Sequence, residues 1–145
     1  MVTEVHFYHD APDLAGVACH LAAKAYGAGR QVTVLLPDET LARQLDQLLW
    51  TRQPGSFLPH VGLHSPLATE TPITLGLSAP EAGWPHGDVL INLCETVPEG
   101  FEHFSMLVEI VGRDDAHRLP ARARWKHYAG CGIRPQAHNT QGDGR

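Results

Sequence analysis

The sequence lacks a glycine-rich phosphate loop, and this absence argues against a nucleotide-binding protein. A turn that binds pyrophosphate needs glycines and free backbone N–H groups at the start of a helix. The first turn between an expected strand and helix is instead His9-Asp10-Ala11-Pro12-Asp13, with two carboxylates and no glycine. Gly27 and Gly29 follow an expected helix, where they end it, and the sequence contains no GxxxxGK[ST] run.

The sequence also has little positive charge, few cysteines and no long apolar run. Its 11 Lys and Arg residues against 16 Asp and Glu residues leave a formal net charge of −5, which argues against a dedicated nucleic-acid binder. The three cysteines stand far apart without a CxxC pair, and an odd number fits a reducing cytoplasm. No stretch approaches the roughly 18 apolar residues of a membrane span, and the N-terminus shows no targeting pattern. We therefore expect a cytoplasmic protein, with no cofactor.

Hydrophobic periodicity predicts alternating strands and helices. Apolar runs that predict strands cover residues 5–8, 32–36, 72–75, 89–93 and 106–111. Helical spacing predicts helices over residues 14–25, after Asp38, and from Asp114 or Asp115 to about Ala129. Two of the strands are apolar throughout, as in parallel sheets covered on both faces. The sequence predicts an α/β fold: an open, mostly parallel, Rossmann-like sheet flanked by helices in a single domain over residues 1–134, with a disordered tail at 135–145.

Aromatic and proline residues gather in the segment that follows the second expected helix. Trp50, Phe57 and Pro59 lie close together in the sequence around a Pro-Gly-Ser run, and His60 follows them. The Pro-Gly-Ser run predicts a surface loop, where two large aromatic side chains are unusual. Clustered exposed aromatic residues favour contact with a partner, so these four residues are candidates for a docking site.

His6, His9 and Asp10 form a string that suggests either a metal site or a small Rossmann-like enzyme. On a strand, however, residues 6 and 9 point to opposite faces, and no second His/Glu pair stands at ligand spacing. His60 has no adjacent serine, cysteine or paired carboxylate that would complete a catalytic set. We expect no catalytic residues and no metal site, and an enzyme that uses the His6 region stays an alternative.

Five of the eleven basic residues lie within fourteen positions near the C-terminus, interleaved with two aromatic residues. They are Arg113, Arg118, Arg122, Arg124 and Lys126, with Trp125 and Tyr128. On a helix, Arg118, Arg122 and Trp125 share one face, and Arg124 and Tyr128 form a neighbouring pair. Arginines beside an indole favour an anionic, partly apolar ligand, and an acidic peptide fits best. The alternatives are single-stranded DNA, or a solvated basic face with Trp125 in the core.

Pro120 lies between two of these arginines, Arg118 and Arg122. In a helix interior, proline removes one hydrogen bond and kinks the helix. If the helix begins near Leu119, Pro120 falls in its first turn and Arg118 belongs to the preceding loop.

From about Val5 to Tyr128, the chain resembles the chi subunit of bacterial DNA polymerase III. The matching segments, whose order in a chain of this length is specific, are Phe7-Tyr8, Ala18-Cys19, Lys24-Ala25-Tyr26, Leu45-Asp46, Leu49-Trp50, Ser56-Phe57-Leu58-Pro59-His60, Asp88-Val89-Leu90-Ile91-Asn92-Leu93, Glu109-Ile110-Val111 and Arg122-Ala123-Arg124-Trp125-Lys126-His127-Tyr128.

The resemblance implies a Rossmann-like fold without a nucleotide site and a non-catalytic accessory subunit of the clamp-loader complex. In that family one surface binds the psi subunit or an alternative helicase, and the matching positions here are Trp50, Phe57, Pro59 and His60. Another surface binds the acidic C-terminal tail of single-stranded-DNA-binding protein. The residues expected in that tail-binding site are Val111, Arg118, Arg122, Arg124, Trp125 and Tyr128. Direct contact with nucleic acid is expected to be weak or absent.

Overall fold

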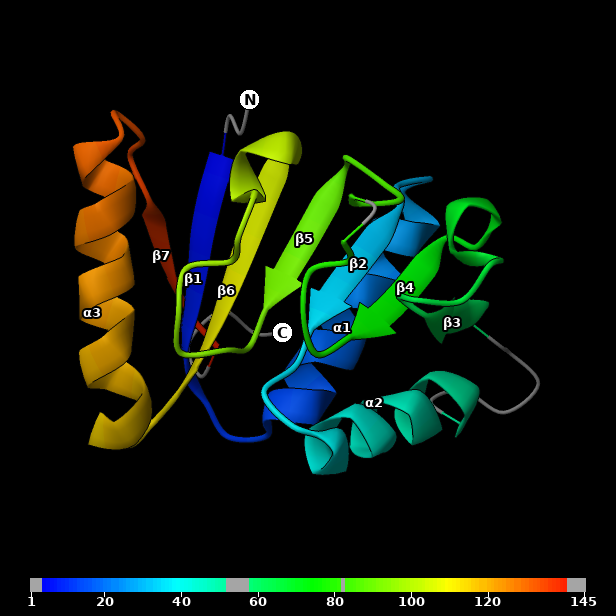
Figure 1. The fold of residues 1–145 in the computed structure, drawn as a ribbon. Coiled ribbons are helices and arrows are strands. Elements are labelled where there is room, and N and C mark those ends of the chain that lie inside the picture. The colour runs from blue at the N-terminus through cyan, green and yellow to red at the C-terminus, as the bar shows by residue number, and fades with distance from the viewer. Residues whose placement is uncertain (1–3, 52–57, 82, 141–145) are drawn as a thin grey trace.

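The computed structural model describes residues 4–51, 58–81 and 83–140. Within these residues, seven strands form one parallel sheet flanked by three α-helices (Figure 1). The strands are β1 (Glu4–Ala11), β2 (Val32–Leu35), β3 (His60–Gly62), β4 (Ile73–Gly76), β5 (Val89–Asn92), β6 (Met106–Gly112) and β7 (Gln136–Asn139). The helices are α1 (Leu14–Gly27), α2 (Glu39–Thr51) and α3 (Asp115–Gly130), with short 3-10 helices η1 (Ala68–Glu70) and η2 (Phe101–His103). The predicted α/β class and open parallel sheet are confirmed.

The strand order is β3-β4-β2-β5-β6-β1-β7, and every neighbouring pair is parallel. All four residues of β2 and all four of β5 are buried, which explains why these two runs are apolar almost throughout. Strands β3 and β7 form the two edges of the sheet. The edges matter for function because the two candidate binding surfaces lie near opposite edges.

Local signals in the sequence set the helix ends. The Asp38 carboxylate accepts a hydrogen bond from the Leu41 backbone N–H at 2.9 Å and so caps the start of α2, as predicted. Helix α1 ends at Gly27, and Gly29 follows with a φ of 79°, a conformation that glycine adopts without steric cost.

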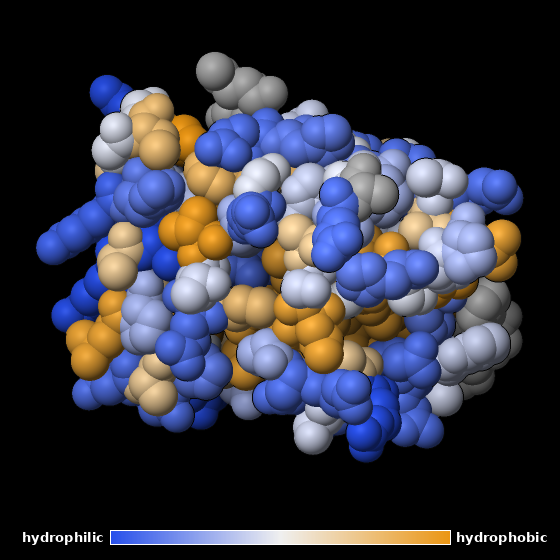
Figure 2. Space-filling model, viewed as in Figure 1, coloured by the Kyte–Doolittle hydropathy of each residue, from blue (hydrophilic) through white to orange (hydrophobic). Residues whose placement is uncertain are grey.

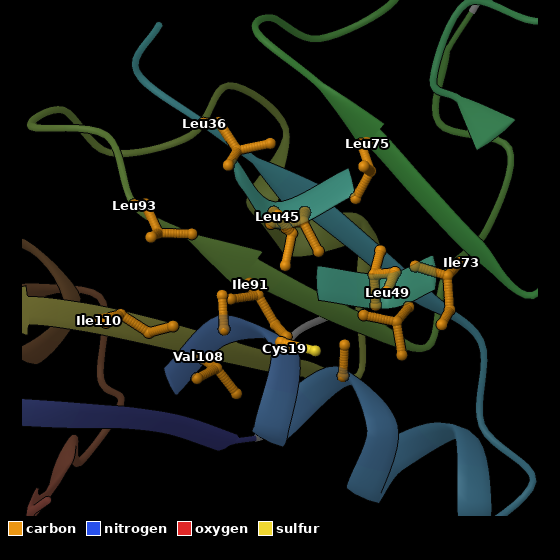
Figure 3. Close-up of a cluster of buried hydrophobic side chains, with 14 of the residues drawn as sticks. Cys19, Leu36, Leu45, Leu49, Ile73, Leu75, Ile91, Leu93, Val108 and Ile110 are labelled. Carbon is orange, nitrogen blue, oxygen red and sulfur yellow. The ribbon is translucent and has the colours of Figure 1, made fainter. Parts of the chain in front are cut away.

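Side chains alternate along the strands and separate into two clusters, one on each face of the sheet. The first cluster lies under α1 and α2, where Cys19, Leu45 and Leu49 meet strand residues such as Ile73 and Ile91 (Figure 3). The second cluster lies on the face that α3 covers, and its largest buried side chains are Phe7, Phe101, Phe104, Leu107 and Tyr128. Helix α3 therefore packs on a separate face from α1 and α2.

Two segments differ from the sequence-based expectation. His60–Gly62 pairs with β4 although residues 61–71 read as a loop, and Gln136–Asn139 pairs with β1 inside the predicted disordered tail. For residues 136–139 the prediction of disorder was wrong, since a short polar run gains strand structure from a partner strand that is distant in the sequence. Residues 141–145 lie outside the described residues.

The visible surface is mainly hydrophilic, with apolar residues in smaller patches scattered over the face (Figure 2). The large apolar side chains that are exposed among the described residues are Tyr26, Trp50, Leu67, Leu77 and Leu119. Within the described ranges, no helix has both the length and the apolar character needed to cross a membrane.

Candidate functional site

A cavity of about 470 Å³ lies between α3 and the carboxyl ends of β1 and β6. Val111 of β6 lines it together with Arg118, Arg122 and Trp125 of α3. The i, i+4, i+7 spacing puts the three α3 residues on one face of the helix. The structure therefore brings together four of the six residues that the sequence assigns to a tail-binding site.

The start of α3 explains why Arg118 can belong to this cavity. Asp114 is the extended N-cap residue, Asp115 begins the helix, and the Arg118 backbone N–H donates to the Asp114 carbonyl at 3.0 Å. Pro120 lies inside the helix, so the alternative start near Leu119 is wrong. The helix loses one backbone hydrogen bond at Pro120 and keeps Arg118 on the same face as Arg122.

Positive charge and apolar surface meet in the cavity. Arg118, Arg122 and Lys126 bring three cations from α3 against the single carboxylate of Asp10. The Trp125 indole packs on Phe7 of β1, with ring centroids 5.0 Å apart, and is only partly buried. Such a site can bind a ligand that carries both carboxylates and an apolar side chain. The tail-binding set predicted from the sequence did not include Lys126, Phe7 and His9, which also line the cavity. Phe7 and His9 share a strand face by their i, i+2 spacing.

The structure places Arg124 and Tyr128 elsewhere, in a buried polar cluster around Glu109 of β6. One Glu109 carboxylate oxygen accepts hydrogen bonds from Arg124 Nε at 3.0 Å and from Asn92 Nδ2 at 3.0 Å. The other oxygen accepts one from the Tyr128 hydroxyl. Glu109 and Tyr128 are 0% exposed and Arg124 is 4% exposed, so neither α3 residue lines the cavity. Together they attach α3 to the sheet.

Burial dominates the acid–base behaviour of this cluster. It raises the pKa of Glu109 from 4.5 to about 7, while the Arg124 guanidinium and the hydrogen bonds from Tyr128, Asn92 and Arg124 limit the rise. Burial and the Glu109 charge also raise the pKa of Tyr128. The sequence carries a signal for this cluster, since Glu109 is the lone carboxylate in the otherwise apolar strand β6.

The candidate docking site has a different geometry from the one that the sequence predicts. Trp50 lies in the last turn of α2 and is 56% exposed, while Pro59 is partly buried. The His60 side chain is only 3% exposed, with Nε2 at 2.8 Å from Asp46 Oδ1 and Nδ1 at 2.7 Å from the Leu58 carbonyl oxygen. The His60 ring packs edge to face against the Trp50 indole, with the ring centroids 5.6 Å apart. The buried His60 side chain therefore supports the exposed Trp50 side chain. Phe57 lies outside the described residues.

The His6, His9 and Asp10 string does not converge on one point. His9 and Asp10 line the cavity at α3, whereas His6 contacts His138 of β7, with its Nδ1 2.9 Å from Nε2. Within residues 4–51, 58–81 and 83–140, no group of three His, Cys, Asp or Glu side chains is arranged to hold a metal ion.

The chain is similar to several known proteins. The sequence profile described as "DNA polymerase III chi subunit, HolC" matches residues 2–136. Proteins named DNA polymerase III subunit chi match from Pseudomonas aeruginosa (35% identity, 94% of this chain and 96% of the relative), Haemophilus influenzae (33%, 76% and 76%) and Escherichia coli (32%, 81% and 79%). The fold also resembles the C-terminal domain of the DEAD-box protein Dbp5, with a TM-score of 0.56 at 13% identity over 97% of this chain and 91% of that one.

Fold and site define an α/β protein with a Rossmann-like parallel sheet, no glycine-rich phosphate turn after its first strand, and a cationic, partly apolar cavity beside its last helix. The profile match and the three relatives then identify the family: the chain belongs to the DNA polymerase III chi subunit family. Membership implies protein partners in the replication complex.

Proposed function

We propose that this chain is a non-catalytic accessory subunit that links the clamp-loader complex of DNA polymerase III to single-stranded-DNA-binding protein. The cavity beside α3 carries the proposal, because three cations there surround an apolar floor. In the proposed complex, Arg118 and Arg122 donate charge-assisted hydrogen bonds to carboxylates of the acidic C-terminal tail. The last apolar side chain of the tail packs between Val111 and Trp125. Three cysteines that stand far apart in the sequence without a CxxC pair favour a reducing, cytoplasmic setting for the complex.

The proposal is tested by titrating the protein with an acidic peptide that ends in an aromatic residue. Arg122→Ala is expected to weaken binding by about 1.5–3 kcal/mol, the range for hydrogen bonds to charged groups. Arg122 is exposed on α3, so the variant should fold normally. Arg43→Ala is the matched control, since Arg43 is an exposed helical arginine paired with Glu39 on the distant α2, and it should leave affinity unchanged.

Two further arms separate a peptide site from a nucleic-acid site. Amidation of the peptide C-terminus should weaken binding, because it removes one carboxylate charge. Binding of a single-stranded oligonucleotide should be weak, and its affinity would fall more steeply with salt than that of the peptide, since DNA releases condensed counterions. Equal peptide affinity in the wild type, Arg122→Ala and the amidated arm would contradict the proposal, and tight oligonucleotide binding would favour the direct DNA-binding alternative.

We also propose that the Trp50 surface docks a psi-type subunit or an alternative helicase. Helix α3 lies beside one edge of the sheet, and the end of α2 lies near the opposite edge (Figure 1). Trp50 stands in the last turn of α2, so the two partners can bind at the same time. His60, locked by Asp46 and Leu58, holds the indole in an exposed position that suits an interface anchor.

Trp50→Ala is expected to cost about 2 kcal/mol or more of partner binding, as aromatic interface anchors do, with a much smaller loss of fold stability. The indole is 56% exposed, so its truncation leaves no buried cavity. Leu119→Ala is the control, because Leu119 is 57% exposed on the far helix α3. Binding is measured by titration with the purified partner, and stability by thermal unfolding. A large fall in melting temperature with unchanged partner affinity would assign Trp50 to the fold.

A further inference from the structure

His9 stands on the strand side of the cavity, opposite the cations of α3. It lines the cavity with Arg118, Arg122 and Lys126, and its Nδ1 lies 2.7 Å from Asp10 Oδ2. Neither the proposed role of the α3 arginines nor that of the Trp50 surface gives this histidine a function. Its position at the carboxyl end of β1 puts an ionisable ring in the wall of an anion site.

The end of β1 that carries His9 has an unusual backbone conformation, which several hydrogen bonds hold in place. Asp10 has a φ of 61°, a region that aspartate and asparagine tolerate better than most residues. Thr140 donates its hydroxyl to the carbonyl oxygens of both His9 and Asp10, at 3.1 and 2.9 Å. Asn139 Nδ2 donates to Asp10 Oδ2 at 3.3 Å. Strained backbone that several contacts maintain is typical of binding and catalytic sites.

The Asp10 carboxylate also determines which nitrogen of the His9 ring carries a proton and which one can contact a ligand. An ionised carboxylate only accepts hydrogen bonds, so Nδ1 must carry a proton. Nε2 is then the nitrogen left for a ligand, and among the described residues it has no hydrogen-bond partner. A neutral ring presents a lone pair at Nε2, which repels a carboxylate, whereas an imidazolium presents an N–H donor and a positive charge.

We propose that His9, positioned by Asp10, binds a carboxylate of the anionic peptide as an imidazolium, so that the cavity takes up a proton with its ligand. The proposal rests on the proposed function, because it assumes that this cavity holds an acidic peptide. The charged groups that face His9 are Asp10 on its own strand and Arg118, Arg122 and Lys126 from α3. Strand β7 adds the neutral Asn139, and β6 adds Val111. Binding of a carboxylate favours the charged ring, and protonation in turn favours binding.

The experiment is a titration of the full chain with the acidic, aromatic-ended peptide between about pH 6 and about pH 8, the interval in which histidines change charge. Peptide carboxylates titrate well below this interval and stay ionised. The wild type is expected to bind at least roughly tenfold more tightly at the acidic end, the effect of one added charge-assisted hydrogen bond. His9→Gln should bind more weakly at the acidic end and with nearly constant affinity across the interval.

Two variants separate a direct role of His9 from a structural one. Asp10→Asn keeps a residue that tolerates the positive φ but removes the carboxylate that orients the His9 ring, so the rise in affinity at the acidic end should become smaller. His117→Gln is the matched control, because His117 lies near Asp114 at the start of α3, outside the cavity lining, and it should leave the pH dependence intact. Calorimetry in two buffers of different ionisation enthalpy should detect proton uptake by the wild type and not by His9→Gln.

Each outcome decides between this proposal and the proposed function. Peptide binding that is equally tight at both ends of the pH interval, or a pH dependence that survives in His9→Gln, overturns the role of His9 and leaves the tail-binding function standing. Absence of peptide binding by the wild type at every pH overturns the tail-binding function, and the role of His9 with it.

Discussion

Replacement of Arg124 by alanine is expected to lower the free energy of unfolding by about 3–5 kcal/mol at about pH 8, the cost of leaving a buried charge without its partner. Arg124 Nε donates to Glu109, and Nη1 donates to the Glu95 carbonyl oxygen at 2.7 Å. Without the guanidinium, the Glu109 carboxylate either stays charged in an apolar core or binds a proton. The loss should therefore be smaller near pH 5, where the carboxyl group is already neutral.

The matched control for Arg124→Ala is Arg122→Ala, two positions earlier on the same helix. Arg122 is exposed and lines the cavity, so its removal should change stability by no more than about 0.5 kcal/mol while it weakens peptide binding. Urea unfolding of both variants measures the difference. Similar small losses in stability for both variants would contradict the buried ion pair. A loss of peptide affinity in Arg124→Ala without a loss of stability would show that Arg124 contacts the peptide.

Protonation of Glu109 should make the protein more stable as the pH falls from about 7 to 4.5, the folded-state and reference pKa values of this carboxyl group. The folded state binds the proton more tightly than the unfolded chain, so the stabilising contribution is complete below the unfolded pKa. It is lost as the pH rises through the folded pKa. The shift is large enough for this one group to change the free energy of unfolding by roughly 3 kcal/mol across the window.

The measurement is urea unfolding of the wild type and Glu109→Gln at several pH values in this window. Glutamine has the size of glutamate but does not titrate, so the difference in slope between the two proteins isolates the contribution of Glu109. Absolute stability of the variant should fall, since Arg124 loses its counter-charge. Identical slopes in both proteins would show that the pKa of Glu109 is the same in the folded and unfolded states, and would contradict the raised pKa.

Most of the fold could be predicted from the sequence because its signals are local. The apolar runs of β2 and β5 identify strands covered on both faces. Asp38 marks the start of α2, because its capping hydrogen bond joins residues only three positions apart in the sequence. Strand β7 could not be predicted in this way. Its residues Gln136–Asn139 are short, polar and largely exposed, and they form a strand only because the edge of β1 is available beside them.

The candidate site likewise has features that local spacing predicts and features that depend on tertiary packing. The helical spacing of Arg118, Arg122 and Trp125 is enough to place the three on one face, because the period of an α-helix is a local property. That spacing also groups Arg124 and Tyr128, but it cannot tell which face of the helix the sheet covers. Here α3 packs with Arg124 and Tyr128 against Glu109 and turns Arg122 outward.

By itself, the sequence determined the three helices, the strands other than β3 and β7, the parallel α/β class and the helix face that carries the arginines and the indole. Only the tertiary structure decided which basic residue of α3 pairs with a buried carboxylate, and that His9 and Asp10 face the same cavity as Arg118. The physical reason is that these contacts depend on the register of α3 over β1 and β6. Burial and charge pairing between elements far apart in the chain set that register, and no local pattern encodes it.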